Sequence, residues 1–441
     1  MRRWWPRSRL WGVVLAGLLL LWQGPGFVRS LRPPRTVTVD FFQDWASSRN
    51  LLQGLPIYEH LAQTVERYLG WSLPANLPPG SWRVNAHPPP GILPFVWLAW
   101  LDYPDACLVW NLFSLAALAA SLVLVAKQLH IRIASWAILP VLACMVVCSP
   151  LRHQLFQGQI NLVLLLLLCI TWATARQAQP CAAGLALGAA TAMKLFPGLL
   201  FVYFALRRQW TVVAAGLTAL LAINILAVCL MGLQTYYSYV AEVLPQVAQF
   251  RSHWCNVSLV GLWSKLFDPT PAGGLLVPLW RSATLAQIGM VVSCAMIVCG
   301  VAWATRGAQT RAARDLAFSL TVIGMLLVSP VTWDHYLVML LLPLAVIWVQ
   351  LPPSGAVRWL WFALVGALFL PPEWVWKVII PGKWPWGIVT PVETLTALSW
   401  QCYALSGLFV LALAGKTWAV SRDQIRESVA KRDLTLSAKA G

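Results

Sequence analysis

Apolar runs long enough to cross a lipid bilayer recur along almost the whole of this 441-residue chain. A membrane-spanning helix needs about 20 predominantly apolar residues, because the hydrocarbon core of a bilayer is roughly 30 Å thick. Apolar residues make up 59% of the chain and charged residues only 11%, whereas a soluble domain has about 25% charged residues. This balance excludes a disordered chain and a disulfide-rich scaffold. It predicts an all-α polytopic membrane protein.

The first apolar run, residues 10–22, follows a basic start and precedes no small-residue cleavage site. We interpret it as an uncleaved first helix that begins in the cytoplasm. Residues 182–206 form a further apolar stretch that is broken at Lys194-Leu-Phe-Pro197. It is either one kinked span or a hairpin of two half-helices. The remaining predicted spans are residues 106–126, 134–148, 161–175, 211–231, 283–304, 316–328, 336–349, 359–370 and 395–414, which gives about 10–12 transmembrane helices.

The chain is strongly basic, with a formal net charge of +17. In a soluble protein this excess would suggest nucleic-acid binding, but a membrane protein concentrates Lys and Arg in its cytoplasmic loops and near anionic lipid headgroups. If residues 182–206 are a hairpin, Arg176 and Arg207–Arg208 share a side with more than half of the 32 basic residues. We therefore expect a multi-pass protein of the cell membrane with both termini in the cytoplasm and no nucleic-acid partner. Residues 1–415 form one membrane domain and residues 416–441 a basic cytoplasmic tail.

A large outer loop, residues 29–90, separates the first span from the next long one. It has apolar residues at helical spacing twice, at Phe41, Trp45 and Leu52 and again at Leu61, Val65 and Tyr68. The spacing predicts two amphipathic helices that lie on the membrane surface. The next segment, residues 85–94 (NAHPPPGILP), is predicted not to form regular helix, because proline lacks a backbone donor and clashes with the preceding turn.

Polar and ionisable residues within or beside the spans gather at the outer face. Such residues are costly in a membrane and are therefore candidates for function. Asp40 and Asp44, four residues apart, share one face of the first amphipathic helix. The alternative readings are that these acids only solvate a surface helix, that His335 is an interfacial residue and that Lys194 snorkels. The candidate site residues are Asp40, Asp44, His87, Arg152, Gln159, Asn161, Lys194, Asn256 and His335.

This set of residues suits the transfer of a sugar from a polyprenyl phosphate. Phosphate is a good leaving group, since its second pKa is about 6, so the reaction needs no general acid. One carboxylate can act as general base on an acceptor hydroxyl, and cations with amide donors can stabilise the departing phosphate. The histidines are too scattered for a metal site and no nucleotide fingerprint is present, so we expect no metal and no cofactor.

An ordered set of short motifs resembles glycosyltransferase family 87. The first is VDFFQDWASSRNLLQGLPIY, in which Asp40 is followed by Gly54, Pro56 and Tyr58. NAHPPPGILPF, GQIN, AGLALGAATAMKLFP, CNVSLVGL and SPVTWDHY follow in the expected order over roughly residues 38–340. Each motif is weak alone, and the ordered set is fairly specific.

The resemblance implies a C-type glycosyltransferase fold, a polyprenyl-phosphate sugar donor and inverting transfer, with mannose as the sugar in characterised members. The family's catalytic Asp falls on Asp40, whereas Asp44 occupies a place that is often Tyr in relatives. The resemblance therefore implies Asp40 as general base and Asp44 as a group that orients the acceptor, although the presence of two acids leaves the choice of base open. Residues implied to bind donor phosphate or sugar are Lys194, His87, Gln159, Asn161, His335, Arg152 and Asn256. The acceptor, a lipid or a glycan, does not carry over, and the oligomeric state is also open.

Two other classes of protein fit parts of the pattern. A transporter or lipid flippase would also be polytopic, but transporters usually carry broken helices at matching positions of two repeats, and only one broken stretch is evident here. A non-catalytic assembly protein would not require acids and cations clustered on one face. The sequence favours the enzyme.

Overall fold

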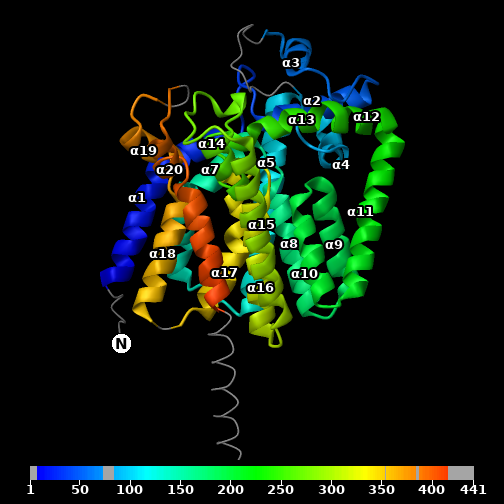
Figure 1. Cartoon of the computed structure of the whole chain (residues 1–441). Helices are drawn as coiled ribbons and strands as arrows, with labels where there is room; N and C mark the ends of the chain where they lie inside the picture. Colours follow the sequence, from blue (N-terminus) through cyan, green and yellow to red (C-terminus); the bar gives the residue numbers. More distant parts are fainter. Residues whose placement is uncertain (1–6, 73–83, 353, 384–386, 416–441) are drawn as a thin grey trace, which may run out of the picture.

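The computed structural model describes residues 7–72, 84–352, 354–383 and 387–415. Long helices form a bundle, and short helices lie across its upper end as drawn in Figure 1. The helices are α1 (Arg7–Ser30), α2 (Asp40–Leu52), α3 (Leu61–Leu69), α4 (Pro89–Ile92), α5 (Tyr103–Leu129), α6 (Ile138–Val147), α7 (Ser149–Gln157), α8 (Asn161–Arg176), α9 (Pro180–Met193), α10 (Leu199–Leu206), α11 (Trp210–Met231), α12 (Leu233–Ser238), α13 (Leu244–Ala248), α14 (Leu259–Phe267), α15 (Ala283–Arg306), α16 (Arg311–Val328), α17 (Leu341–Gln350), α18 (Gly355–Phe369), α19 (Pro372–Ile379) and α20 (Pro391–Thr396). Shorter turns are η1 (Leu93–Trp100), η2 (Ser135–Ala137), η3 (Phe196–Gly198), η4 (Tyr239–Val243), η5 (Gln249–Ser252), η6 (Pro271–Gly273) and η7 (Asp334–Leu340).

By length and composition, five helical segments can cross a membrane: α1, α5, α11, α15 and Pro391–Gly415, which α20 opens. Two bent pairs, η2–α6 with α7 (60°) and α18 with α19 (86°), bring the number to seven if each pair is one span. The shorter apolar helices α8, α9, η3–α10 and η7–α17 complete the bundle. The prediction of an all-α polytopic membrane protein is therefore confirmed. The predicted tail, residues 416–441, lies outside the described residues.

The stretch 182–206 is a hairpin. Helix α9 ends at Met193, Lys194 is extended (φ −146°, ψ 137°), and η3 and α10 lead away from it. Arg176 at the end of α8 and Arg207 directly after α10 line the same hollow. Both half-helices therefore start and finish on one side of the bundle, and their connection at Lys194 points to the other side.

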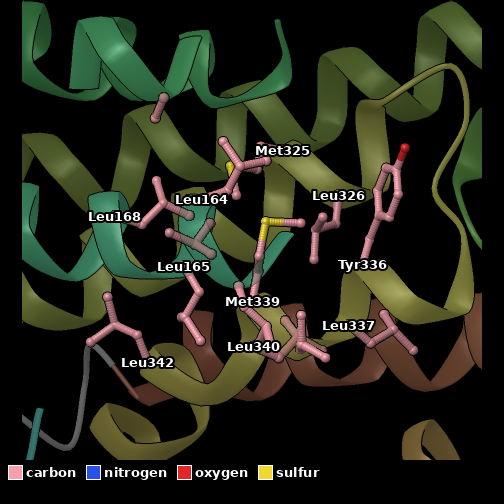
Figure 2. Packing of buried hydrophobic residues seen from close by; sticks show 14 of the residues in the cluster. Leu164, Leu165, Leu168, Met325, Leu326, Tyr336, Leu337, Met339, Leu340 and Leu342 are labelled. Atoms are coloured by element: carbon pink, nitrogen blue, oxygen red, sulfur yellow. The ribbon is translucent and has the colours of Figure 1, made fainter. Parts of the chain in front are cut away.

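Helix α16 is the centre of the bundle. Ala313 and every residue from Asp315 to Leu327 are buried, so this helix faces protein on all sides. Its Met325 and Leu326 pack against Leu164 of α8 and Met339 of η7 (Figure 2). This apolar packing supports the residues at the upper ends of α8 and α16, because a close-packed interior fixes side-chain positions.

The outer loop contains both predicted helices, but the prediction of two helices on the membrane surface is wrong for α2. Nine of its thirteen residues are buried, including Asp44. Its polar groups have partners within the protein: Ser47 Oγ donates to Ile57 O at 2.9 Å and Asn50 Nδ2 to Pro56 O at 2.8 Å. A buried polar group is tolerated when it is hydrogen-bonded in this way.

The proline-rich segment, residues 85–94, also differs from its prediction. It is extended only up to Pro88, after which α4 forms one turn and η1 continues it. Pro89 and Pro90 occupy the first positions of α4, where the missing N–H costs nothing because that donor has no partner within the helix. Gly91 then allows α4 to approach α9, since a Cβ there would lie 2.9 Å from Met193 O.

Candidate active site

Asp40 is the first residue of α2 and is half-buried. Its backbone N–H donates to Gln157 Oε1 at 3.1 Å, and its Oδ2 accepts from Gln159 Nε2 at 2.8 Å. A carboxylate in the first turn of a helix is favoured by the helix dipole. The second oxygen, Oδ1, accepts no hydrogen bond from another residue in the described part of the chain.

Gln159 reaches Asp40 because α7 ends in a tight turn at Gly158 (φ +63°). A side chain at position 158 would be strained at this φ, and its Cβ would lie 2.6 Å from Phe41 Cβ. The turn is braced by Gln154, whose side-chain amide donates to Gln159 O and whose Oε1 accepts from Asn161 Nδ2 at 2.8 Å. The GQIN motif is therefore a turn that aims one glutamine at the helix start of Asp40.

Lys194 lies in the break between the two half-helices, and Pro197 follows it. Its side chain is 5% exposed. Nζ donates to Gln159 Oε1 at 3.2 Å and to Asn161 Oδ1 at 3.1 Å, and lies 4.0 Å from the centroid of the Tyr336 ring. Among the described residues no carboxylate forms an ion pair with this ammonium. A buried cation that only neutral groups hold is suited to an anionic ligand.

Asp44 and His87 form a buried pair beside Asp40. Asp44 is 1% exposed, and its Oδ1 lies 2.7 Å from His87 Nδ1 and accepts from Asn85 Nδ2 at 3.1 Å. Tyr58 donates its hydroxyl to His87 O at 2.7 Å. The pair fixes the orientation of the imidazole and leaves His87 Nε2 as the ring nitrogen not engaged by Asp44.

One cavity of about 330 Å³ joins these groups. Its polar residues are Asp40, Gln43, His87, Gln159, Lys194 and Ser329, and its apolar and aromatic residues include Leu195, Phe196, Tyr239, Leu244, Val247, Val328, Val331, Trp333 and Tyr336. Asp44 and Asn161 do not line it but lie directly behind His87 and Lys194. A cavity with a polar wall and an apolar wall fits an amphiphilic ligand.

The other three predicted residues lie away from the cavity lining. Arg152 donates to Gln23 Oε1 of α1 at 2.9 Å. Asn256 donates to Pro330 O at 3.0 Å and accepts from Thr332 N at 3.0 Å, so it holds the loop whose Pro330 and Val331 line the cavity. His335 stacks parallel to Trp333, and its Nδ1 lies 3.5 Å from Asp334 Oδ1.

An ionic cluster lies next to His335, and the sequence did not indicate how its residues pair. Asp334 pairs with His153 of α7, whose Nε2 lies 3.2 Å from Glu373 of α19. The sequence also missed Gln43 and Tyr239 as cavity residues. Gln43 is one turn after Asp40, so helical spacing is a signal for it, whereas nothing local marks Tyr239 or Glu373.

These observations define a membrane-embedded protein with an amphiphilic cavity lined by one carboxylate and one buried ammonium. The sequence model of glycosyltransferase family 87 matches residues 85–330, which include His87, Gln159 and Lys194. The match covers more than half of the chain. The protein belongs to glycosyltransferase family 87 and is a membrane glycosyltransferase.

Three relatives have similar sequences. A polyprenol-phosphate-mannose-dependent alpha-(1-2)-phosphatidylinositol mannoside mannosyltransferase from Mycolicibacterium smegmatis is 27% identical over 75% of this chain and 72% of its own length. The protein of the same name from Mycobacterium tuberculosis is 25% identical over 70% and 69%. A polyprenol-phosphate-mannose-dependent alpha-(1-2)-phosphatidylinositol pentamannoside mannosyltransferase from Mycolicibacterium smegmatis is 28% identical over 63% and 65%. No solved structure matches the chain significantly.

Proposed function

We propose that this protein transfers a mannosyl group from polyprenyl-phosphate mannose to a hydroxyl of a lipid or glycan acceptor at the outer face of the cell membrane. The observation that carries the proposal is the bridge from Asp40 through Gln159 to Lys194 in the wall of one cavity. It holds a carboxylate and a cation on either side of a single side-chain amide. The names of the relatives support the donor.

In the proposed reaction the acceptor oxygen attacks the anomeric carbon and forms the new glycosidic bond. Asp40 Oδ1 takes the hydroxyl proton as general base. The bond between the anomeric carbon and the phosphate oxygen breaks, and its electron pair leaves with the polyprenyl phosphate. Attack on the face opposite the leaving group inverts the anomeric configuration. Asp40 is better placed than Asp44 to act as the base, because Asp40 borders the cavity and Asp44 does not.

Lys194 stabilises the negative charge that grows on the departing phosphate. A cation already held in place by Gln159 and Asn161 needs little reorganisation during the reaction, and such preorganised groups give the largest catalytic effects. Because this cation can take the place of a metal ion at the phosphate, we propose that the transfer requires no metal and no cofactor. The apolar wall, which includes Phe196 and Val328, accommodates the prenyl chain.

Asp44 has a different role in this proposal from the one that the resemblance implies. A carboxylate that is 1% exposed behind His87 cannot touch an acceptor. It acts by orienting His87, which lines the cavity and contacts the donor or the acceptor. The loop that Asn256 holds, which includes Pro330, forms another part of the cavity wall.

The arginines support the proposed orientation in the membrane. Arg176 and Arg207 line one hollow together with Arg311 and Arg314, at the opposite ends of α8, α10 and α16 from the cavity. The positive-inside rule puts this basic end in the cytoplasm, so the cavity faces outward and both termini lie inside. A reporter fused to Gly441, which is outside the described residues, tests this orientation: cytoplasmic signal is expected, and an external signal would reverse it.

The proposed activity is tested by incubating the purified protein with polyprenyl-phosphate mannose and a membrane lipid extract. Mass spectrometry should show a mannosylated lipid or glycan and free polyprenyl phosphate, with and without a metal chelator. A flippase, the alternative that the polytopic architecture also allows, would move lipid between leaflets and form no new product. Lipid movement without a product would therefore favour that alternative.

A further inference from the structure

A second hollow lies at the end of the bundle opposite the cavity. Arg176 ends α8, Arg207 follows α10, and Arg311 and Arg314 begin α16. The same three helical segments reach the cavity at their other ends, near Gln159, at Phe196 and at Val328. Helix α16 has 18 residues and rises about 1.5 Å per residue, so the two sites are separated by roughly the thickness of a hydrocarbon core.

The charges in this hollow are unbalanced. Its four arginines face one acid, Asp315, which is buried and accepts from Trp172 Nε1 at 2.8 Å. Arg176 Nε lies 3.5 Å from Asp315 Oδ1 and has no hydrogen-bond acceptor in the described part of the chain. One acid against four guanidinium groups leaves an excess of three positive charges at one concave site.

Topology alone does not account for this arrangement. The positive-inside rule requires basic residues in the loops, but it does not require them to converge from three helices onto a hollow. The hollow has a volume of about 80 Å³, whereas a single water molecule needs only about 10–15 Å³ on a comparable measure, so the hollow has room for a group larger than water. Arginine donors match phosphate oxygens in pairs.

The surroundings favour a phosphate that is carried by a lipid. Gln209 lines the hollow, and the next residue, Trp210, is 62% exposed at the start of the membrane helix α11. Exposed tryptophans at helix ends mark the level of lipid headgroups. Val202 of α10, one residue before Tyr203 of the hollow, is 40% exposed and apolar. The hollow is therefore next to a surface that faces lipid.

We propose that this hollow binds the phosphate of an anionic phospholipid headgroup, at the face opposite the catalytic cavity. The residues that form it are Arg176, Arg207, Arg311 and Arg314 around Asp315. The site is independent of the proposed mannosyl transfer, because none of its residues lines the cavity. Its occupant ties together the lower ends of α8, α10 and α16.

The test measures the thermal stability of the full-length protein in detergent with added phosphatidylglycerol, phosphatidylcholine or inorganic phosphate. A ligand that binds only the folded state raises the melting temperature in a concentration-dependent manner. Phosphatidylglycerol should raise it and phosphatidylcholine should not. Stabilisation by inorganic phosphate but not by phosphatidylglycerol would support a phosphate site and contradict a lipid as its ligand. No stabilisation by either anion would overturn the proposal.

Variants separate this site from general attraction between the protein and acidic lipid. Arg311 is exposed, and its side chain forms no hydrogen bond or ion pair with another described residue. Arg311→Gln is therefore not expected to affect folding. It should weaken phosphatidylglycerol binding about fivefold, and Arg311→Gln with Arg207→Gln by about 25-fold. Arg208→Gln and Arg306→Gln remove charges at the same end of the bundle from residues that do not line the hollow. Equal weakening by the two control variants would overturn the proposal.

Discussion

Asp44 Oδ1 lies 2.7 Å from His87 Nδ1, yet only His87 borders the cavity. The carboxylate is buried, and its second oxygen has no partner in the described part of the chain. A buried acid with one unpaired oxygen is costly to maintain. Its contact with a cavity-lining imidazole supports the proposal that Asp44 positions His87.

Replacing Asp44 by Asn keeps the shape of this pair but removes the charge. We expect Asp44→Asn to lower kcat/KM about tenfold, since a hydrogen bond to a charged group is stronger by about 1.4 kcal/mol than a neutral one. Steady-state kinetics at several pH values checks this, because loss of the charge should also change the pH profile. Tyr58→Phe, which removes the hydroxyl that donates to His87 O, is the matched control. A purely structural role for Asp44 would lower stability and leave the pH profile unchanged.

Lys194 should control the affinity for the donor. We expect Lys194→Met to raise the KM for polyprenyl-phosphate mannose about 10- to 100-fold and to lower kcat, because the charge-assisted bond to phosphate is lost. Lys194→Arg retains the charge, so its KM for the donor and its kcat should change less than those of Lys194→Met. The KM for the acceptor should change little. Equal donor binding by wild type and Lys194→Met would argue against contact between Lys194 and phosphate.

We expect activity to require a neutral side chain at position 159, because Gln159 contacts both Asp40 and Lys194. In Gln159→Glu the new carboxylate would repel Asp40 and neutralise Lys194, whereas Gln159→Ala only removes the bridge. We therefore expect Gln159→Glu to be less active than Gln159→Ala, and Gln159→Ala to lose about tenfold in kcat/KM. Thermal stability of each variant shows whether it folds. The reverse order of activities would contradict the proposed bridge.

Lys265 of α14 gives a prediction for stability against pH. It is fully buried, and its Nζ donates to Asn256 O at 3.0 Å and Leu398 O at 2.8 Å. Burial lowers the pKa of Lys265 to about 8, below the ordinary value of about 10.4 for an unfolded chain. Between these values the unfolded state binds more protons, so the free energy of unfolding rises with pH.

The measurement is the melting temperature of wild type and Lys265→Met from pH 7 to pH 11. The difference between them isolates Lys265 from other groups that titrate in this range. Wild type should gain stability relative to Lys265→Met as the pH rises from about 8 to about 10.4. A constant difference would mean that the lysine keeps its ordinary pKa when folded.

The sequence predicted the class of fold and named four residues that line the cavity, because both depend on local patterns. Apolar run length marked the spans, and the break at Lys194 combined with the distribution of arginines favoured the hairpin. The GQIN motif was noted only as part of the family resemblance, and the structure shows that it is a turn in which Gly158 has a positive φ. Asp40, His87, Gln159 and Lys194 were all named from the sequence, and all four line the cavity.

The remainder depends on contacts between residues distant in the chain. The helix α2 was expected on the membrane surface because its polar residues look solvated, but Asn85 and the 56–57 backbone satisfy them inside the protein. The burial of Asp44 follows from the same packing. The link from His153 to Glu373 joins residues more than two hundred positions apart, and no local pattern contains it.

The central claim is that Asp40 is the general base. The most direct measurement is the kcat of Asp40→Asn for mannosyl transfer, with Asp44→Asn as the matched control one helical turn away. We predict a loss of about 10²- to 10⁴-fold for Asp40→Asn, with donor binding and melting temperature unchanged. A folded Asp40→Asn protein that retains activity within a few fold of wild type would contradict this account.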